Sequence, residues 1–165
     1  MRQLSSSQLY VDVRLFDKPD TLSYDLSQHL PRRLTVGPVL VLANNPPVFL
    51  SVIRKRLAKL LYALECERAR TLDRQKRLAL NHEVLRLNNA CFTSKPSIAV
   101  PDVLCTTPHA LATIHLYWQT IYITTSITDQ QLQTALSLLH SGGLLVVYGH
   151  LTAAQEAVLA AHQMV

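Results

Sequence analysis

The chain has 165 residues, of which 48% are hydrophobic and 16% are charged. This composition fits one folded domain of ordinary size with a packed core, and it excludes an intrinsically disordered chain. No apolar run approaches the roughly 20 residues of a membrane-spanning helix, and the amino-terminal residues lack the apolar core of a signal peptide. We therefore expect a cytoplasmic protein that makes no membrane contact.

The net charge of +5 is distributed unevenly along the chain. Ten of the sixteen Lys and Arg residues lie between residues 54 and 86, where four acidic residues oppose them, so this segment carries a charge of +6. Residues 96–165 contain no Lys or Arg. The asymmetry predicts a positive surface that faces an anionic partner.

The first third of the chain predicts two strands and one ambiguous segment. Residues 9–16 alternate between apolar and polar side chains as a strand does, and residues 17–20 have the composition of a turn. Residues 21–30 suit either a strand or a short helix, which we expect to end at Pro31. Residues 39–43 form an unbroken apolar run after Gly37 and Pro38, which predicts a strand buried on both faces.

The middle of the chain predicts helix, because residues 48–95 contain neither Gly nor Pro. An apolar stripe at helical spacing runs as far as Leu64, fails around residues 68–75 and resumes near Leu78 and Leu85. Two helices, or one long helix whose middle projects into solvent, both fit this pattern. Asp73 and Arg77 are spaced to form an ion pair within one helix.

The last third alternates strands with helices. Residues 98–100 and 102–105 are expected to form a pair of strands or one interrupted strand. Further strands are expected at 120–125 and 144–148, and a short helix at 108–116. Thr128 is expected to cap a helix that runs to His140 and stops at residues 141–143, and Thr152 a final helix with Gln155 completing a capping box.

Together these elements predict an α/β fold, with a mostly parallel sheet flanked by helices and a long basic helix or helical hairpin inserted in the middle. We expect a single domain over residues 1–165. Its parts are an N-terminal β region (1–46), a basic helical segment (47–95) and an α/β region (96–165).

Motifs of catalysis and cofactor binding are missing from the sequence. With four glycines, it contains neither of the two glycine-rich phosphate-binding motifs. The seven histidines lack the spacing of metal ligands, the three cysteines form no CxxC pair, and neither Ser126 nor Ser141 lies in a nucleophile elbow. We therefore predict no metal, no cofactor and no catalytic residue, and the sequence does not favour an enzyme.

Two segments resemble the first RecA-like domain of superfamily 2 helicases. One is the strand and loop Val39-Leu40-Val41-Leu42-Ala43-Asn44-Asn45-Pro46, and the other is Asp102-Val103-Leu104-Cys105-Thr106-Thr107-Pro108-His109-Ala110-Leu111. Residues 118–125 fall where that family has its acidic motor strand. The sequence departs from the family in having no phosphate loop before Val39 and no Asp-Glu pair after Ile123. The resemblance therefore implies a relative that keeps the scaffold and the nucleic-acid contact without ATPase activity.

Three functions remain open from the sequence. The first is a non-catalytic accessory module that binds the phosphate backbone of nucleic acid through its basic helical segment. The second is an assembly subunit whose helical middle packs on a protein partner or a second copy. The third is a small-ligand α/β enzyme with Asp102, His109, Asp129 or His150 at strand ends. The nucleic-acid-binding residues predicted for the first are Arg54, Lys55, Arg56, Lys59, Arg68, Arg70, Arg74, Lys76 and Arg77.

Overall fold

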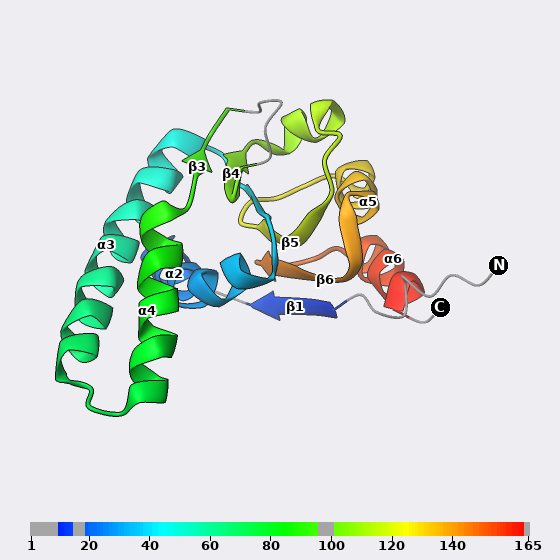
Figure 1. The fold of residues 1–165 in the computed structure, drawn as a ribbon. Coiled ribbons are helices and arrows are strands. Elements are labelled where there is room, and N and C mark those ends of the chain that lie inside the picture. Colours follow the sequence, from blue (N-terminus) through cyan, green and yellow to red (C-terminus); the bar gives the residue numbers. More distant parts are fainter. Residues whose placement is uncertain (1–9, 15–18, 96–100, 164–165) are drawn as a thin grey trace.

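The protein is an α/β structure built on six parallel strands in the order β1-β6-β5-β2-β4-β3 (Figure 1). The computed structural model describes residues 10–14, 19–95 and 101–163. The elements are β1 (Tyr10–Arg14), α2 (Pro19–Val36), β2 (Val39–Leu42), α3 (Pro46–Arg70), α4 (Arg74–Asn89), β3 (Phe92–Thr93), β4 (Val103–Thr106), the 3₁₀ helix η1 (Pro108–Thr113), β5 (Trp118–Ile123), α5 (Asp129–Ser137), β6 (Leu139–Tyr148) and α6 (Ala153–Gln163). The predicted fold class is confirmed.

Strand β2 lies near the middle of the sheet and separates two hydrophobic layers. Its four residues are buried, as the apolar run predicts, and alternate side chains enter opposite layers. Helices α2, α3 and α4 cover one face of the sheet, and η1, α5 and α6 cover the other. Within the described residues, no helix is long and apolar enough to cross a membrane.

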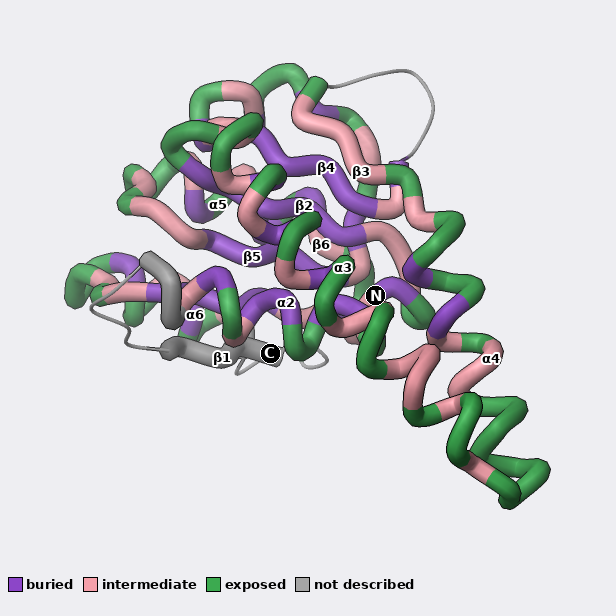
Figure 2. Tube along the Cα trace, turned by 90° about the vertical axis from the view of Figure 1, so that its left-hand side faces the viewer, coloured by how far each residue is buried: buried purple, intermediate pink, exposed green. Residues whose placement is uncertain are grey.

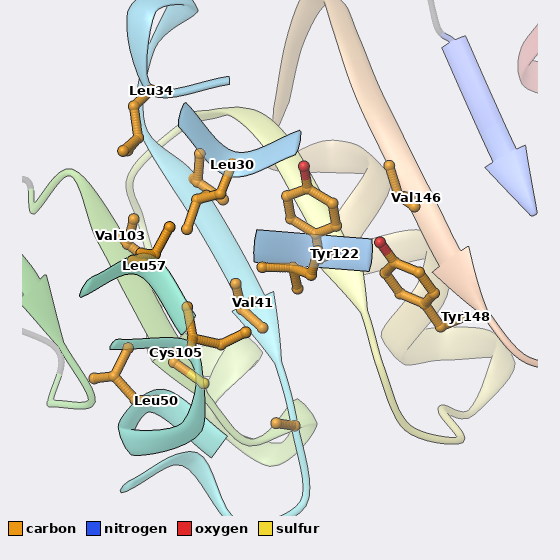
Figure 3. Packing of buried hydrophobic residues seen from close by; sticks show 14 of the residues in the cluster. Leu30, Leu34, Val41, Leu50, Leu57, Val103, Cys105, Tyr122, Val146 and Tyr148 are labelled. Carbon is orange, nitrogen blue, oxygen red and sulfur yellow. The ribbon is translucent and has the colours of Figure 1, made fainter. Parts of the chain in front are cut away.

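The first layer is packed by leucines from the helices against the strands (Figure 3). Leu50 and Leu57 of α3 lie over Val103 and Cys105 of β4, and all four side chains are at most 6% exposed. At the other side of the layer, Tyr148 stacks beside Tyr122 with ring centroids 6.2 Å apart, and its hydroxyl donates to Asp25 Oδ2 at 2.8 Å.

Helix α2 shows that residues 21–30 are helical and that the expected stop at Pro31 is wrong. The helix continues to Val36 and contains Pro31 in its interior. Pro31 has no N–H to donate to the carbonyl one turn earlier, which costs stability in a helix. Burial offsets this cost, because Leu26, Leu30 and Leu34 recur every four residues on the core face and are fully buried.

Some sequence predictions fall at or beyond the ends of the described residues. Strand β1 confirms residues 10–14 of the first predicted strand, whose remaining residues lie outside the described part. Residues 17 and 18 and the strand predicted at 98–100 also lie outside it. Pro19 and Asp20, expected in a turn, instead form the first turn of α2.

The Gly-Gly pair that was expected to stop a helix lies inside a strand. Helix α5 ends at Ser137, and β6 already begins at Leu139. Between the pairs Trp118–Leu139 and Thr120–Leu144, β6 has four residues where β5 has one, so the chain bulges. Gly142 adopts a φ of 76°, and a Cβ on Gly143 would lie 2.7 Å from Leu139 Cγ, so the bulge requires both glycines.

Arg86 joins three elements at the amino-terminal end of β4. Its guanidinium donates two hydrogen bonds to the carbonyl of Leu34, at 3.0 and 2.6 Å, in the last turn of α2, where carbonyls lack helical partners. It also lies 3.4 Å from Asp102 Oδ1. The other oxygen of Asp102 accepts from the backbone N–H of Cys91 at 2.7 Å. Arg86 therefore has a role in the fold.

We predict that Arg86→Ala lowers the free energy of unfolding by about 1 kcal/mol, because it removes a charged donor from a partly buried carbonyl. Urea denaturation followed by the fluorescence of Trp118, the single tryptophan, measures the change. Arg77→Ala removes the same charge from an exposed position without such contacts and serves as the control. Equal stability of the two variants would contradict this role.

Candidate functional site

The α3–α4 hairpin extends far beyond the hydrophobic core. The last fully buried residue of α3 is Leu57 and the first of α4 is Val84, and between them only Leu60, Leu61 and Leu64 still pack half-buried against the core. Figures 1 and 2 show this part projecting away from the sheet, with its far end almost entirely exposed. The lapse of the apolar stripe predicted this projection, and the two-helix alternative is confirmed.

The turn between the two helices is stabilised without Gly or Pro. Asp73 precedes α4 and caps it, because its Oδ1 accepts from the backbone N–H groups of Gln75 at 2.9 Å and Lys76 at 3.4 Å. Thr71 Oγ1 donates to the carbonyl of Glu67 at 2.7 Å. Leu72 between them is 97% exposed. The carboxylate of Asp73 thus serves the backbone, where the sequence suggested a pair with Arg77.

Three of the nine predicted basic residues bind within the protein. Arg54 donates to the carbonyl of Phe92 at 2.7 Å and lies over its ring. Arg56 donates to Ser23 Oγ at 3.1 Å and lies over the ring of Tyr24. Arg68 donates to Asn81 Oδ1 at 3.2 Å and joins α3 to α4. These contacts hold the hairpin to α2, to β3 and to itself.

The other six are exposed and make no side-chain hydrogen bond or ion pair within the described chain. They form two adjoining groups, which we call the cationic surface. In α3, a stripe opposite the core contains three of them together with Tyr62, which is 70% exposed. The first turn of α4 contains the other three. The six are Lys55, Lys59, Arg70, Arg74, Lys76 and Arg77.

Cations in the first turn of α4 lie at an electrostatically unfavourable place. The backbone N–H groups give a helix amino terminus a partial positive charge, which favours acidic side chains there. The first turn of α4 has no acidic residue after the cap, and it contains Arg74, Lys76 and Arg77. A phosphate bound at this tip would offset the mutual repulsion of these groups.

The titratable residues of the enzyme alternative are not brought together. Asp102 precedes β4 at its amino-terminal end, and it is occupied by Arg86 and Cys91. His109 and Asp129 are exposed in η1 and at the start of α5, while His150 follows β6. No group of three or more His, Cys, Asp or Glu in the described part could hold a metal ion.

Cys105 is unsuited to act as a nucleophile. The side chain is 1% exposed within the sheet, and this burial raises the pKa of its thiol to about 12. The thiol is therefore protonated at neutral pH, and the thiolate required for nucleophilic attack is absent.

A second candidate site, which we call the β2–β5 crevice, lies at the carboxyl ends of the central strands. Strands β2 and β5 are neighbours, but α3 and α5, which follow them, pack on opposite faces of the sheet. In open α/β sheets, ligands bind at such a switch point. The cavity here has a volume of about 280 Å³. Its lining residues come mostly from the carboxyl ends of β5 and β6 and the segments after them, including Thr125, Ser126, Gly149 and His150, while Asn44 is the lining residue that follows β2 and Gln155 comes from α6.

The sequence does not single out this crevice as a site, although His150 is one of the residues of the enzyme alternative. One signal is present, because Asn44 follows the predicted strand 39–43 and Thr125 ends the predicted strand 120–125. The pairing of these strands was needed to bring the residues together, and Thr125 Oγ1 donates to Asn44 Oδ1 at 2.6 Å. Thr124 also bridges the strands, since its hydroxyl donates to the Leu42 carbonyl at 2.7 Å.

The cap of α4 can be tested by Asp73→Ala, which removes the acceptor of two backbone N–H groups. We predict that amide hydrogen exchange at Gln75 and Lys76 accelerates about fivefold, corresponding to about 1 kcal/mol of local stability. Asp73→Asn keeps a side-chain oxygen and is expected to retain most of the protection. Unchanged exchange in Asp73→Ala would show that the carboxylate does not cap the helix.

No protein-family model matches the sequence of this chain, and no curated protein matches it significantly. Its function is therefore inferred from the geometry, burial and charge of its own residues.

Proposed function

We propose that this protein is a non-catalytic nucleic-acid-binding module that contacts the phosphate backbone through its α3–α4 hairpin. The observation that carries the proposal is the cationic surface. Six Lys and Arg side chains lie exposed on the hairpin, five of them beyond Leu57 and Lys55 on the outer side of the part that packs on the core, and the fold uses none of them for a side-chain contact within the described residues. A charged face that serves only to keep the helices solvated would not require these cations to lie together.

The spacing of the cations suits a polyanion. Lys55 and Arg70 are fifteen positions apart on one face, so the stripe is about 22 Å long at the rise of an α-helix. Phosphates along one strand of a duplex are spaced by about 3.4 Å along its axis, so the stripe and the tip can face several of them at once. Base stacking uses aromatic side chains, and the stripe has Tyr62 as its aromatic residue. Contact with the phosphate backbone of the nucleic acid is therefore favoured over base stacking.

The proposal also agrees with what the resemblance to RecA-like domains implies. That resemblance predicts a scaffold that contacts nucleic acid without hydrolysing ATP. The strand after which the helicase family has Asp-Glu is followed here by Thr124, Thr125 and Ser126. Kinship with helicases and a cytoplasmic location stay predictions.

The proposal is tested by fluorescence-anisotropy titration of the full chain with single-stranded and duplex DNA and with RNA over a range of salt concentrations. If all six cations engage phosphates, the slope of log K against log[salt] is about −4 on single strands and about −5 on duplex DNA. Arg74→Ala/Arg77→Ala is expected to make the duplex slope shallower by about 2 and to weaken binding at low salt by at least tenfold.

Arg32→Ala/Lys95→Ala removes the same net charge from exposed positions outside the hairpin and is the matched control. We expect it to change the slope by less than half as much, because loss of net charge alone acts weakly at a distance in salt. Equal effects of the two double variants would mean that net charge, and not this surface, governs binding. Affinity no greater than that of an unrelated basic protein of equal charge would reject the proposal.

Protein assembly through the hairpin is the second candidate function, and it is favoured by the exposed apolar side chains of α4. Leu78 and Leu85 are seven residues apart, share one side of the helix and are 50% and 57% exposed. If this stripe joins two copies, sedimentation velocity without nucleic acid gives a dimer that Leu78→Ser/Leu85→Ser converts to a monomer. A monomer at all accessible concentrations would exclude self-assembly.

A further inference from the structure

The β2–β5 crevice has polar groups that the fold leaves available. Asn44, Ser126 and His150 follow three neighbouring strands, β2, β5 and β6, and all three line the cavity. The hydrogen bond from Thr125 fixes the Asn44 carboxamide oxygen, so the NH₂ group is left to donate. Within the described chain, no side-chain hydrogen bond engages that NH₂ group, the Ser126 hydroxyl or the His150 ring.

The remaining lining is apolar or already satisfied. Ile127 and Leu151 are half-buried and supply most of the apolar wall, to which the almost fully buried Ile123 and Val147 add little, and no Lys, Arg, Asp or Glu is among the lining residues. The volume of about 280 Å³ lies just below the range of typical ligand pockets, which span roughly 300–1,000 Å³. The cavity therefore suits a ligand of nucleoside size, and it offers no countercharge to an ionic group.

The three helices that follow these strands offer a phosphate only part of their amino termini. Anions bind such termini through free backbone N–H groups. In α3, the first two helical residues are Pro46 and Pro47, which have no N–H. In α5 and α6, Thr128 and Thr152 accept the third N–H through their side chains at 3.1 Å, in complete capping boxes, so only the first two N–H groups of each helix stay free.

We propose that the β2–β5 crevice binds an uncharged, hydroxyl-bearing ligand of nucleoside size and discriminates against its phosphorylated form. The Asn44 NH₂ group donates to a ligand hydroxyl, while Ser126 and a neutral His150 can each donate and accept. The apolar wall contacts the ring of the ligand. Gly149, with a φ of +131° and no atom within 4 Å of where a Cβ would lie, leaves its part of the crevice open.

The test uses the full ¹⁵N-labelled chain, titrated with adenosine and uridine and with their 5′-monophosphates, and follows the amide signals of Thr125 and Gly149. We expect at least one nucleoside to shift both signals, and to bind about tenfold more tightly than its monophosphate. Asn44→Ala and Ser126→Ala each remove one neutral hydrogen bond and are expected to weaken nucleoside binding about three- to tenfold.

Asn88→Ala and Ser51→Ala make the same chemical changes at exposed hairpin positions outside the crevice, and they are expected to leave nucleoside affinity unchanged. Three results overturn the proposal. They are equal or tighter binding of the monophosphate, unchanged affinity in both crevice variants, and no shift at Thr125 and Gly149 with either nucleoside at millimolar concentration. If the monophosphates shift only the amide signals of the cationic surface and neither nucleoside shifts Thr125 and Gly149, the crevice proposal fails. The proposed nucleic-acid function would still stand in that case.

Discussion

The architecture depends on a mismatch in length between a strand and the helix that follows it. Strand β2 has four residues and spans about 13 Å, whereas α3 has 25 residues and is about 37 Å long. A helix that returns along a parallel sheet needs to be only about as long as the strands that it covers, and α3 is much longer than β2. The overshoot has no core to pack against, so α4 must accompany it as a partner. The projecting hairpin and its exposed charge both follow from this excess length.

The hairpin uses its basic residues differently along its length. Close to the core, Arg54, Arg56 and Arg86 donate to carbonyl or hydroxyl groups of neighbouring elements, and their aliphatic stems add packing. Beyond the core, α3 and α4 have only each other within reach, as Arg68 shows by donating to Asn81, and the side chains of Arg74 and Arg77 face solvent. The same residue type therefore anchors one end of the hairpin and charges the other. The number of Lys and Arg residues in the sequence therefore exceeds the number of cations that are available to a partner.

Local signals in the sequence sufficed for most of the sheet and for the hairpin, because buried parallel strands and Gly-free helices have strong local patterns. They failed where long-range packing overrides local preference. Pro31 continues a helix because the leucines around it are buried, and Gly142 and Gly143 form a bulge because β5 dictates the register of β6. The nine basic residues were predicted as one surface, but their division into bonded and solvent-facing side chains was not, since it depends on contacts between elements. Arg68 bonds to Asn81 beyond the core, whereas Lys55 faces solvent beside the core. The β2–β5 crevice also escaped, because Asn44 and Ser126 are far apart in the chain and meet only through strand pairing.

Helix α3 connects the two candidate sites. It begins two residues after Asn44 of the crevice, packs on the core from Leu50 to Leu57, and ends at Arg70 at the tip of the hairpin. The helix rises about 10 Å from Pro46 to Ile53 and about 25 Å from Ile53 to Arg70. If α3 tilted as a rigid rod about Ile53, its charged tip would move about two and a half times as far as its crevice end, and in the opposite direction. A small displacement next to Asn44 would therefore correspond to a larger one at the tip.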